Sequence, residues 1–231
     1  MITIPDLESK TAEEILIWVN ETFGEKSALA SSFGAEDVVL TDMLLKINPK
    51  FKIFTLDTGR LPAETYDVWE RIEEKYGVKI EAYFPETKSL EEMINKHGPN
   101  LFYRSVYLRK LCCNIRKVEP LNRALKGLEA WVCGLRKGQS VTRQDIKKVE
   151  IDDMHNGIIK VNPLADWSET QVWAYIRENN VPYNKLHDQN YPSIGCAPCT
   201  RAVKPGEDIR AGRWWWELPE SKECGLHSRK K

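Results

Sequence analysis

Five of the six cysteines are spaced in a way that indicates metal or thiol chemistry. Cys112 and Cys113 are adjacent, Cys196 and Cys199 form a C-x-x-C motif, and Cys224 stands alone near the C-terminus. A disulfide between adjacent cysteines is disfavoured, because their Cα atoms lie about 3.8 Å apart while relaxed disulfides span roughly 4.4–6.8 Å. The first four cysteines are therefore interpreted as ligands of one inorganic centre.

Four thiolates are a donor set that suits either zinc or an iron–sulfur cluster, and the cysteine count does not choose between them. Arg116 and Lys117 follow the adjacent pair at a spacing of four residues. On a helix, that spacing would let their positive charges offset the negative charge of the centre. The sixth cysteine, Cys133, lies in an apolar segment and is interpreted as a small core residue.

Cys224 is the candidate nucleophile. Gly225 follows it directly and His227 lies three residues on. A thiol beside histidine and basic groups has a lowered pKa, which makes it more reactive at neutral pH. A surface cysteine without a function is the alternative, and these residues alone favour neither.

Three loops have the composition of an anion-binding site. Residues 31–37 lie where a strand passes into a helix, which would direct free backbone N–H groups at a phosphate. Residues 57–60 follow the next strand, at the sheet edge where open α/β folds bind ligands. Residues 134–143 carry Arg136 and Arg143, and guanidinium groups bind phosphate or sulfate well. Ordinary turns and a solvated basic loop are the competing interpretations, and a shared sheet edge favours binding.

The elements that would position these residues alternate between strand and helix. This alternation predicts a mostly parallel, twisted sheet with helices on both faces. The Thr11 and Glu14 pair predicts a capping box for a first helix, and the Asn156-Gly157 turn predicts a hairpin. The other predicted strands cover residues 27–32, 51–56, 78–84 and 130–134, and the other predicted helices cover residues 37–46, 63–76, 89–96, a segment around the adjacent cysteines, and a run opened by Ser168.

The composition limits the classes of partner. The 231 residues include 34 basic and 34 acidic side chains, so nothing in the net charge predicts binding to a nucleic acid or a membrane surface. The N-terminus has neither a basic segment with an apolar core nor an apolar run long enough to span a bilayer. We therefore expect a cytoplasmic protein, and a reducing cytosol suits clustered cysteines that bind a metal.

Taken together, these motifs resemble the assimilatory sulfonucleotide reductases, specifically the cluster-bearing adenylylsulfate (APS) reductases of bacteria and plants. The combination of Cys-Cys, C-x-x-C and a terminal Glu-Cys-Gly-Leu-His is the most specific part of the resemblance. The matching segments are residues 31–37, 56–59, 112–117, 134–136, 139–140, 191–196, 210–214 and 223–227.

The resemblance implies a fold of the adenine nucleotide alpha-hydrolase-like, PP-loop type. It also implies a [4Fe–4S] cluster with a structural and electrostatic role, held by Cys112, Cys113, Cys196 and Cys199. The implied substrate-binding residues are Ser31, Ser32, Phe33, Gly34, Leu56, Asp57, Thr58, Gly59, Lys117 and Arg136, with Arg210, Arg213 and His227 around the phosphosulfate.

The resemblance implies a reaction in two steps and a chain of two domains. The Cys224 thiolate attacks the sulfur of APS, AMP leaves, and thioredoxin or a similar dithiol then releases sulfite from the S-sulfocysteine. Residues 1–204 would form the α/β domain that binds nucleotide and cluster, and residues 205–231 a mobile tail that carries Cys224. Pro205-Gly206 and Gly212 are the predicted pivots of this tail.

The sequence leaves three alternatives to an APS reductase open. The first is a reductase that uses the 3′-phosphorylated nucleotide (PAPS) or both nucleotides; the resemblance favours APS over it, since within the family the four cysteines go mainly with APS. A nucleotidyl transferase of the ATP-pyrophosphatase type shares the fold, but the terminal Cys-Gly-Leu-His argues against it. A nucleotide sensor stabilised by zinc would perform no turnover. A homo-oligomer and a monomer are equally compatible with the sequence.

Overall fold

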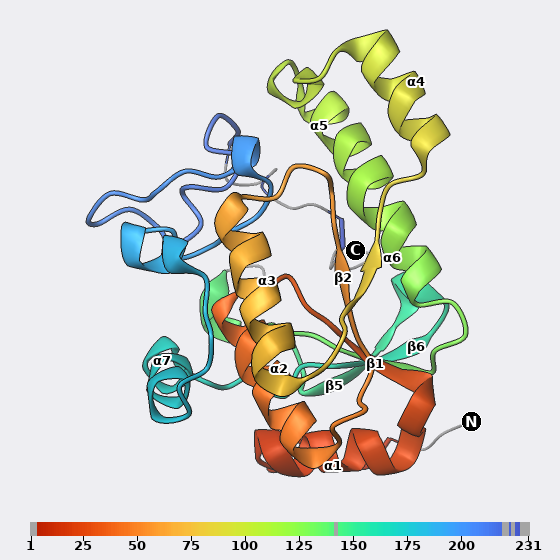
Figure 1. The fold of residues 1–231 in the computed structure, drawn as a ribbon, viewed down its shortest axis with the longest axis vertical. Coiled ribbons are helices and arrows are strands. Elements are labelled where there is room, and N and C mark those ends of the chain that lie inside the picture. The colour runs from red at the N-terminus through yellow and green to blue at the C-terminus, as the bar shows by residue number, and fades with distance from the viewer. Residues whose placement is uncertain (1–3, 141–142, 219–221, 223–224, 227–231) are drawn as a thin grey trace. The chain divides into compact units, whose positions relative to one another are not determined.

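The computed structural model describes residues 4–140, 143–218, 222, 225 and 226. Within them the strands form a six-stranded sheet with the order β3-β2-β1-β4-β6-β5 (Figure 1). The strands are β1 (Ser27–Ala30), β2 (Ile53–Leu56), β3 (Glu81–Tyr83), β4 (Ala130–Val132), β5 (Val149–Asp152) and β6 (Ile158–Val161).

The pairing of the strands is mostly parallel. β1 pairs in parallel with β2 on one side and with β4 on the other, and β4 pairs in parallel with β6. β5 is antiparallel to β6, and the connection between them contains Asn156 at φ 60° and Gly157 at φ 73°. The predicted sheet and the predicted hairpin are both confirmed.

The helices match the predicted pattern, with some shifted ends. They are α1 (Ala12–Phe23), α2 (Ala35–Ile47), α3 (Ala63–Tyr76), α4 (Thr87–His97), α5 (Val106–Cys113), α6 (Glu119–Ala124) and α7 (Glu169–Glu178). A π-helical turn, Asn114–Val118, joins α5 to α6. Capping boxes begin α1 at Thr11 and α7 at Ser168. None of the described helices is both long and apolar enough to traverse a lipid bilayer.

The chain divides into two compact units, each considered over its described residues. The first comprises Met1–Phe54, Glu64–Glu81 and Gly127–Lys185. The second comprises Thr55–Ala63, Ala82–Lys126 and Leu186–Lys231. The described part of the predicted tail therefore falls in the second unit.

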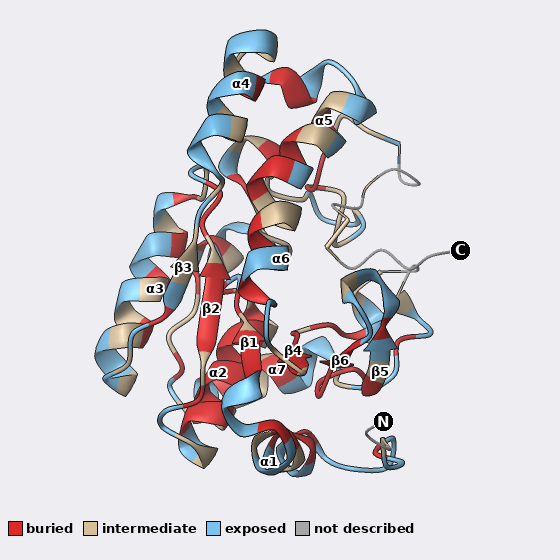
Figure 2. Cartoon of the chain, turned by 90° about the vertical axis from the view of Figure 1, so that its right-hand side faces the viewer, coloured by how far each residue is buried: buried red, intermediate tan, exposed pale blue. Residues whose placement is uncertain are grey.

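The first unit has an apolar core between its strands and helices. The strands β1 and β4 are largely buried (Figure 2). α1 contributes Ile15, Leu16 and Val19 to this core, all with no exposed surface. The sequence of β4 and of β1 therefore reads as a continuous apolar or small-residue run, as a strand with two covered faces requires.

The second unit has a different kind of core. Its buried cluster contains Phe102, Trp214 and the four predicted ligand cysteines. Met93, Leu101 and Ile115 complete it. The buried cluster of the second unit therefore contains four thiols, whereas the core of the first unit is made of apolar side chains.

One polar group joins three helices of the first unit. Asp42 on α2 accepts hydrogen bonds from Tyr76 of α3 at 2.7 Å and from Tyr175 of α7 at 2.6 Å. Lys46 Nζ lies 2.7 Å from the same carboxylate. Burial opposes the charge of Asp42, but these donors outweigh it, so the pKa of the carboxyl lies below its ordinary value.

We expect Asp42→Asn to lower the free energy of unfolding by about 1–3 kcal/mol, because a single amide oxygen cannot accept from all three donors. Asp67→Asn is the matched control, since Asp67 forms an exposed ion pair with Arg71 at 3.0 Å. That change should cost at most about 0.5 kcal/mol. Urea unfolding of both variants measures the difference, and equal effects would contradict the role of Asp42.

Candidate functional site

The four predicted ligand cysteines line one cavity in the second unit. Cys112 and Cys113 end α5, and Cys196 and Cys199 flank a short 3-10 turn. All four are buried, and none forms a disulfide. The other side chains that line the cavity are Phe102, Arg109, Arg116, Lys117, Arg213 and Trp214. The structure thus brings together cysteines that lie far apart in the sequence.

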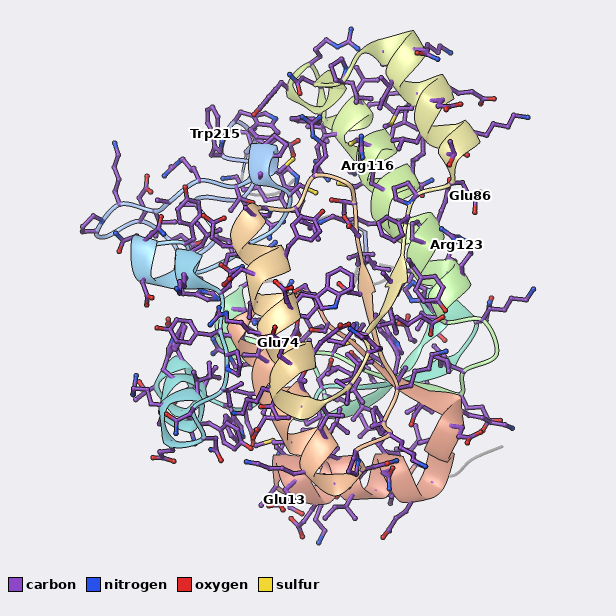
Figure 3. All side chains as sticks on the ribbon, in the orientation of Figure 1. Glu13, Glu74, Glu86, Arg116, Arg123 and Trp215 are labelled. Carbon is purple, nitrogen blue, oxygen red and sulfur yellow. The ribbon has the colours of Figure 1, made fainter. Side chains whose placement is uncertain are left out.

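The π-helical turn after the adjacent cysteines carries two of the cations that line the cavity. α5 begins at Ser105, whose hydroxyl accepts from the Leu108 N–H, and runs directly into this turn. π-helical turns are rare and are frequent at functional sites. Arg116, labelled in Figure 3, is buried and donates from Nη1 to the Thr58 carbonyl at 2.5 Å.

The predicted segment Leu56, Asp57, Thr58 and Gly59 lies against the C-x-x-C motif. Thr58 Oγ1 lies 3.3 Å from Cys196 Sγ, and the Ala197 N–H donates to the Arg60 carbonyl at 2.8 Å. Gly59 has φ 67°, a conformation that favours glycine, and its N–H donates to Asp57 Oδ1 at 2.8 Å. These contacts hold the segment beside the cysteine cavity.

The cavity is electrostatically uneven. Burial raises the pKa of Cys199 to about 12 and also raises the pKa of Cys112 above its ordinary value. Burial opposes ionisation of Cys196 as well, but Lys117, Thr58 and Arg213 outweigh it, so the pKa of this thiol is lowered. The cations therefore favour a negative charge at Cys196, whereas burial dominates at Cys199.

Arg116 Nε and Trp214 Nε1 are buried N–H groups of side chains that line the cavity, and neither has an acceptor among the described residues. A buried donor without an acceptor costs free energy. Among the described residues, no group of three or more His, Cys, Asp or Glu side chains is arranged to hold a metal ion.

The other predicted basic residues lie in the C-terminal part of the second unit. Arg213 is buried and donates from Nη1 to Ser193 Oγ and to the Ile194 carbonyl, both at 3.2 Å. Arg210 Nη2 donates to the Lys222 carbonyl at 3.1 Å. Cys224 and His227 lie outside the described residues.

Two glycines of this segment are explained by close packing. A Cβ added at Gly195 would lie 2.3 Å from Arg213 Nη2, so only glycine lets that guanidinium pass. A Cβ at Gly212 would lie 2.2 Å from the Arg201 carbonyl oxygen. Close backbone contact therefore accounts for Gly212, which the sequence suggested as a pivot.

In the first unit, two predicted loops meet at one edge of the sheet. Residues 31–34 follow β1 and residues 133–136 follow β4, and these strands are parallel neighbours. Phe33 is buried at φ 59°, and Gly34 forms the N-cap of α2. The buried Arg136 side chain forms an ion pair with Glu36 at 2.7 Å and donates to the Trp167 carbonyl at 3.2 Å. The serine-glycine loop and Arg136 are thus linked through α2.

Asp37 is a site residue that the sequence did not single out. Its Oδ2 accepts from both the backbone N–H and the hydroxyl of Ser32, each at 2.7 Å. A Cβ at Gly134 would lie 2.2 Å from Asp37 Oδ1. Asp37 therefore holds the first loop and packs on the start of the second. The available signal was an acidic residue in the first turn of a helix after a serine.

Burial raises the pKa of Asp37 to about 6, above the ordinary value of 3.8. The folded protein therefore binds this proton more tightly than the unfolded chain does, and Asp37 contributes stability at low pH that is lost as the pH rises through about 6. We expect the stability of the wild type relative to Asp37→Asn to fall by about 1 kcal/mol between pH 5 and pH 7. Urea unfolding of the two proteins at both pH values measures this change. A relative stability that does not vary with pH would contradict a buried, protonated Asp37.

The chain also matches known proteins over most of its length. Residues 26–202 match the family model described as the phosphoadenosine phosphosulfate reductase domain. The chain belongs to the phosphoadenosine phosphosulfate reductase family. The family resemblance drawn from the cysteine and loop motifs is thereby confirmed.

Curated members of this reductase family are similar to the chain over almost all of its residues. The adenosine 5'-phosphosulfate reductase of Allochromatium vinosum is 53% identical over 227 residues, which cover 98% of this chain and 88% of that protein. The adenosine 5'-phosphosulfate reductase of Burkholderia cepacia is 51% identical over 225 residues, which cover 96% of this chain and 89% of that protein.

Solved structures support the fold. The phosphoadenylyl-sulfate (PAPS) reductase of Candida auris, in a phosphate complex, superposes with a TM-score of 0.73 at 33% identity and covers 87% of this chain and 99% of that one. The FMN adenylyltransferase of Candida glabrata has a TM-score of 0.57 at 15% identity and covers 92% of this chain and 72% of that one. The second likeness shows the fold alone, and the predicted PP-loop type of sheet is confirmed.

Proposed function

We propose that this chain reduces adenylylsulfate to sulfite and AMP in the cytoplasm, with thioredoxin or a similar dithiol protein as the reductant. The observation that carries the proposal is a buried cavity lined by four cysteines and four cations, in a chain about half identical to proteins named adenosine 5'-phosphosulfate reductase.

In the proposed enzyme, Cys112, Cys113, Cys196 and Cys199 hold a [4Fe–4S] cluster. Their thiol groups line one cavity, and the N–H groups Arg116 Nε and Trp214 Nε1 of side chains that line it lack acceptors among the described residues. The sulfides of a cluster accept hydrogen bonds, so this donor set fits such a group. When bound, the cluster would join α5 to the C-x-x-C segment and supply fixed charge beside the reaction, without passing electrons to the substrate.

The proposed substrate-binding residues are those that the resemblance implies, and each unit is considered by itself. In the first unit, Ser31, Ser32, Phe33, Gly34 and Arg136 would bind the nucleotide at the amino end of α2, where backbone N–H groups favour an anion. In the second unit, the residues that would bind substrate are Leu56, Asp57, Thr58, Gly59, Lys117, Arg210, Arg213 and His227. Of these, Lys117 and Arg213 line the cysteine cavity.

The reaction begins with the Cys224 thiolate. Its sulfur attacks the sulfur atom of APS, an S–S bond forms, and the S–O bond breaks so that AMP leaves with the electron pair. Lys117 and Arg213 would stabilise the charge that develops on the sulfate and phosphate oxygens. A thiolate of the reductant then attacks Cys224 Sγ, which displaces sulfite, and the second thiol of the reductant frees Cys224.

The tail, residues 205–231, is proposed to bring Cys224 to the substrate and then to expose it. Each step needs a different neighbour for the same sulfur, first the nucleotide and then a protein thiol. Gly225 has φ 86°, and a Cβ there would lie 3.7 Å from Val118 of the π-helical turn. This contact supports an approach of the tail to the turn that carries Lys117.

We expect Cys224→Ser to abolish sulfite release from APS under multiple turnover, because a hydroxyl cannot form the S–S bond of the intermediate. The assay is anaerobic sulfite release with thioredoxin, with intact-protein mass to detect the S-sulfo adduct. Cys133→Ala is the control, since Cys133 is buried in the first unit and should leave turnover within a fewfold of the wild type. Sustained sulfite release by Cys224→Ser would contradict the mechanism.

The same assay compares APS with its 3′-phosphorylated form. The likeness to the Candida auris protein, which is named a PAPS reductase, makes the phosphorylated nucleotide the second candidate substrate. We expect a clear preference for APS. Equal rates would favour a reductase that uses both nucleotides.

We expect Cys112→Ser and Cys199→Ser to lose iron and the broad visible absorption of the anaerobically purified protein, because each removes one of four ligands. Cys133→Ala should keep the iron and sulfide content of one cluster per chain. Iron analysis and absorption spectra measure this. Zinc in place of iron in the anaerobically purified protein would contradict the cluster.

A further inference from the structure

Two arginines in the second unit lie over the ring of one tryptophan. The guanidinium carbon of Arg109 lies 4.8 Å from the centre of the Trp214 ring, and that of Arg213 lies 4.7 Å from it. Trp214 is 1% exposed and has φ 41°, which is unusual for a side chain of this size. A cation over an aromatic face is attracted more strongly when it is desolvated. The stack therefore fixes the two guanidinium groups relative to each other.

A buried carboxylate completes this stack. Arg109 Nε and Nη2 donate to Glu217 Oε1 and Oε2 at 2.9 and 2.7 Å. The Arg109 side chain has no exposed surface, and that of Glu217 is 3% exposed. A bidentate ion pair of this kind restricts both partners in angle and in distance.

The surrounding backbone ties the stack to the cysteine cavity. The Trp214 N–H donates to the Cys199 carbonyl at 3.1 Å, and the Glu217 N–H donates to the Trp214 carbonyl at 2.8 Å. Arg109 precedes Cys112 by three residues on α5. Arg109, Arg213 and Trp214 all line the cavity. The ion pair of Arg109 and Glu217 is thus connected to Cys112 through α5 and to Cys199 through Trp214. It is also connected to Arg213, which directly precedes Trp214 in the chain.

We propose that Arg109 and Glu217 are positioning residues for the first chemical step: their ion pair holds Trp214, and through it the guanidinium of Arg213, in place at the cysteine cavity. The same pair fixes the chain at Glu217, seven residues before Cys224. The inference rests on the proposed function, in which Arg213 binds the phosphosulfate and Cys224 attacks it.

A contribution to stability alone does not account for this arrangement. A buried ion pair is often no more stabilising than apolar side chains of similar volume, because both charges lose their hydration. The neighbouring pair of Arg201 and Glu207, at 2.8 Å, is partly exposed and does not line the cavity. The difference between the two pairs is the contact of Arg109 with Trp214 and the cavity.

The test separates the two steps of the reaction in the cluster-containing protein. In Glu217→Gln, we expect S-sulfation of Cys224 by APS in a single turnover to slow by about 10- to 100-fold, because a small misplacement of a substrate-binding group has an effect of this size. Release of sulfite by thioredoxin from protein already S-sulfated should change less than about threefold. Glu207→Gln, the matched control, should leave both steps near wild-type rates.

A second pair of variants tests the stack without changing a charge. Trp214→Phe keeps an aromatic face beside the two arginines, and Trp214→Leu fills part of the space without one. We expect S-sulfation by the Phe variant to be at least about fivefold faster than by the Leu variant at equal iron content. Iron content is measured for every variant, so loss of the cluster is separated from misplacement of Arg213.

The outcomes distinguish this inference from the proposed function. If the wild type forms no S-sulfocysteine from APS, the proposed function fails. If the wild type forms it and Glu217→Gln does so at the same rate, or slows both steps equally, the positioning role is wrong. Should Glu217→Gln lose its iron, equal S-sulfation rates in the Phe and Leu variants would overturn the inference, and a faster Phe variant would support it.

Discussion

The second unit depends on the balance of charge around a buried group of thiols. Four cysteines share a cavity with Arg109, Arg116, Arg213 and Lys117. Ionised thiols so far from water would repel one another, and buried cations without partners would be as costly. Arg109 is instead neutralised by Glu217, and the cations outweigh burial at Cys196 but not at Cys112 or Cys199. The lowered pKa of Cys196 and the raised pKa of Cys199 show how unevenly that balance is distributed.

The segment after α5 is irregular where it contributes cations to this cavity. An α-helix places neighbouring side chains 100° apart around its axis, and the inserted residue of a π-helical turn changes that angle. The turn Asn114–Val118 carries Arg116 and Lys117, and both line the cavity together with the two preceding cysteines. Arg116 is held there by the Thr58 carbonyl. The same constraint places Gly195 where a larger residue would displace Arg213.

In the first unit, the sheet topology alone brings the two predicted binding loops together. Parallel pairing of β1 and β4 brings their following loops to one sheet edge without any special interaction. What then needs fixing is the conformation of each loop, and two adjacent acidic residues of α2 do this. Glu36 holds Arg136, and Asp37 holds Ser32 and packs on Gly134. Arg136 of the basic loop is therefore buried and neutralised by Glu36, whereas Lys137 beside it is exposed.

Local patterns in the sequence predicted most of the elements and all four cysteines of the cavity. The capping box at Thr11, the Asn156-Gly157 turn and the apolar strands are encoded within a few residues, so tertiary contacts had little to change. The ends of α2 and α4 were shifted by two residues or fewer. The adjacent cysteines and the C-x-x-C motif were recognisable because thiols cluster for few other reasons in a reducing environment. The nucleophile Cys224 remains a prediction from sequence, since it lies outside the described residues.

The sequence by itself determined the family, the alternation of strands and helices, and the residues that chemistry would select. Only the tertiary structure decided which charges neutralise which. Glu217 and Arg109 are 108 positions apart, and Glu36 and Arg136 are 100 apart. Nothing local marks such partners, because a Glu or Arg in sequence is as compatible with solvent as with a buried ion pair. Only the folded structure decides whether such a residue stays in solvent or forms a buried ion pair, because a charge removed from water needs an opposite charge nearby and its position depends on the tertiary fold.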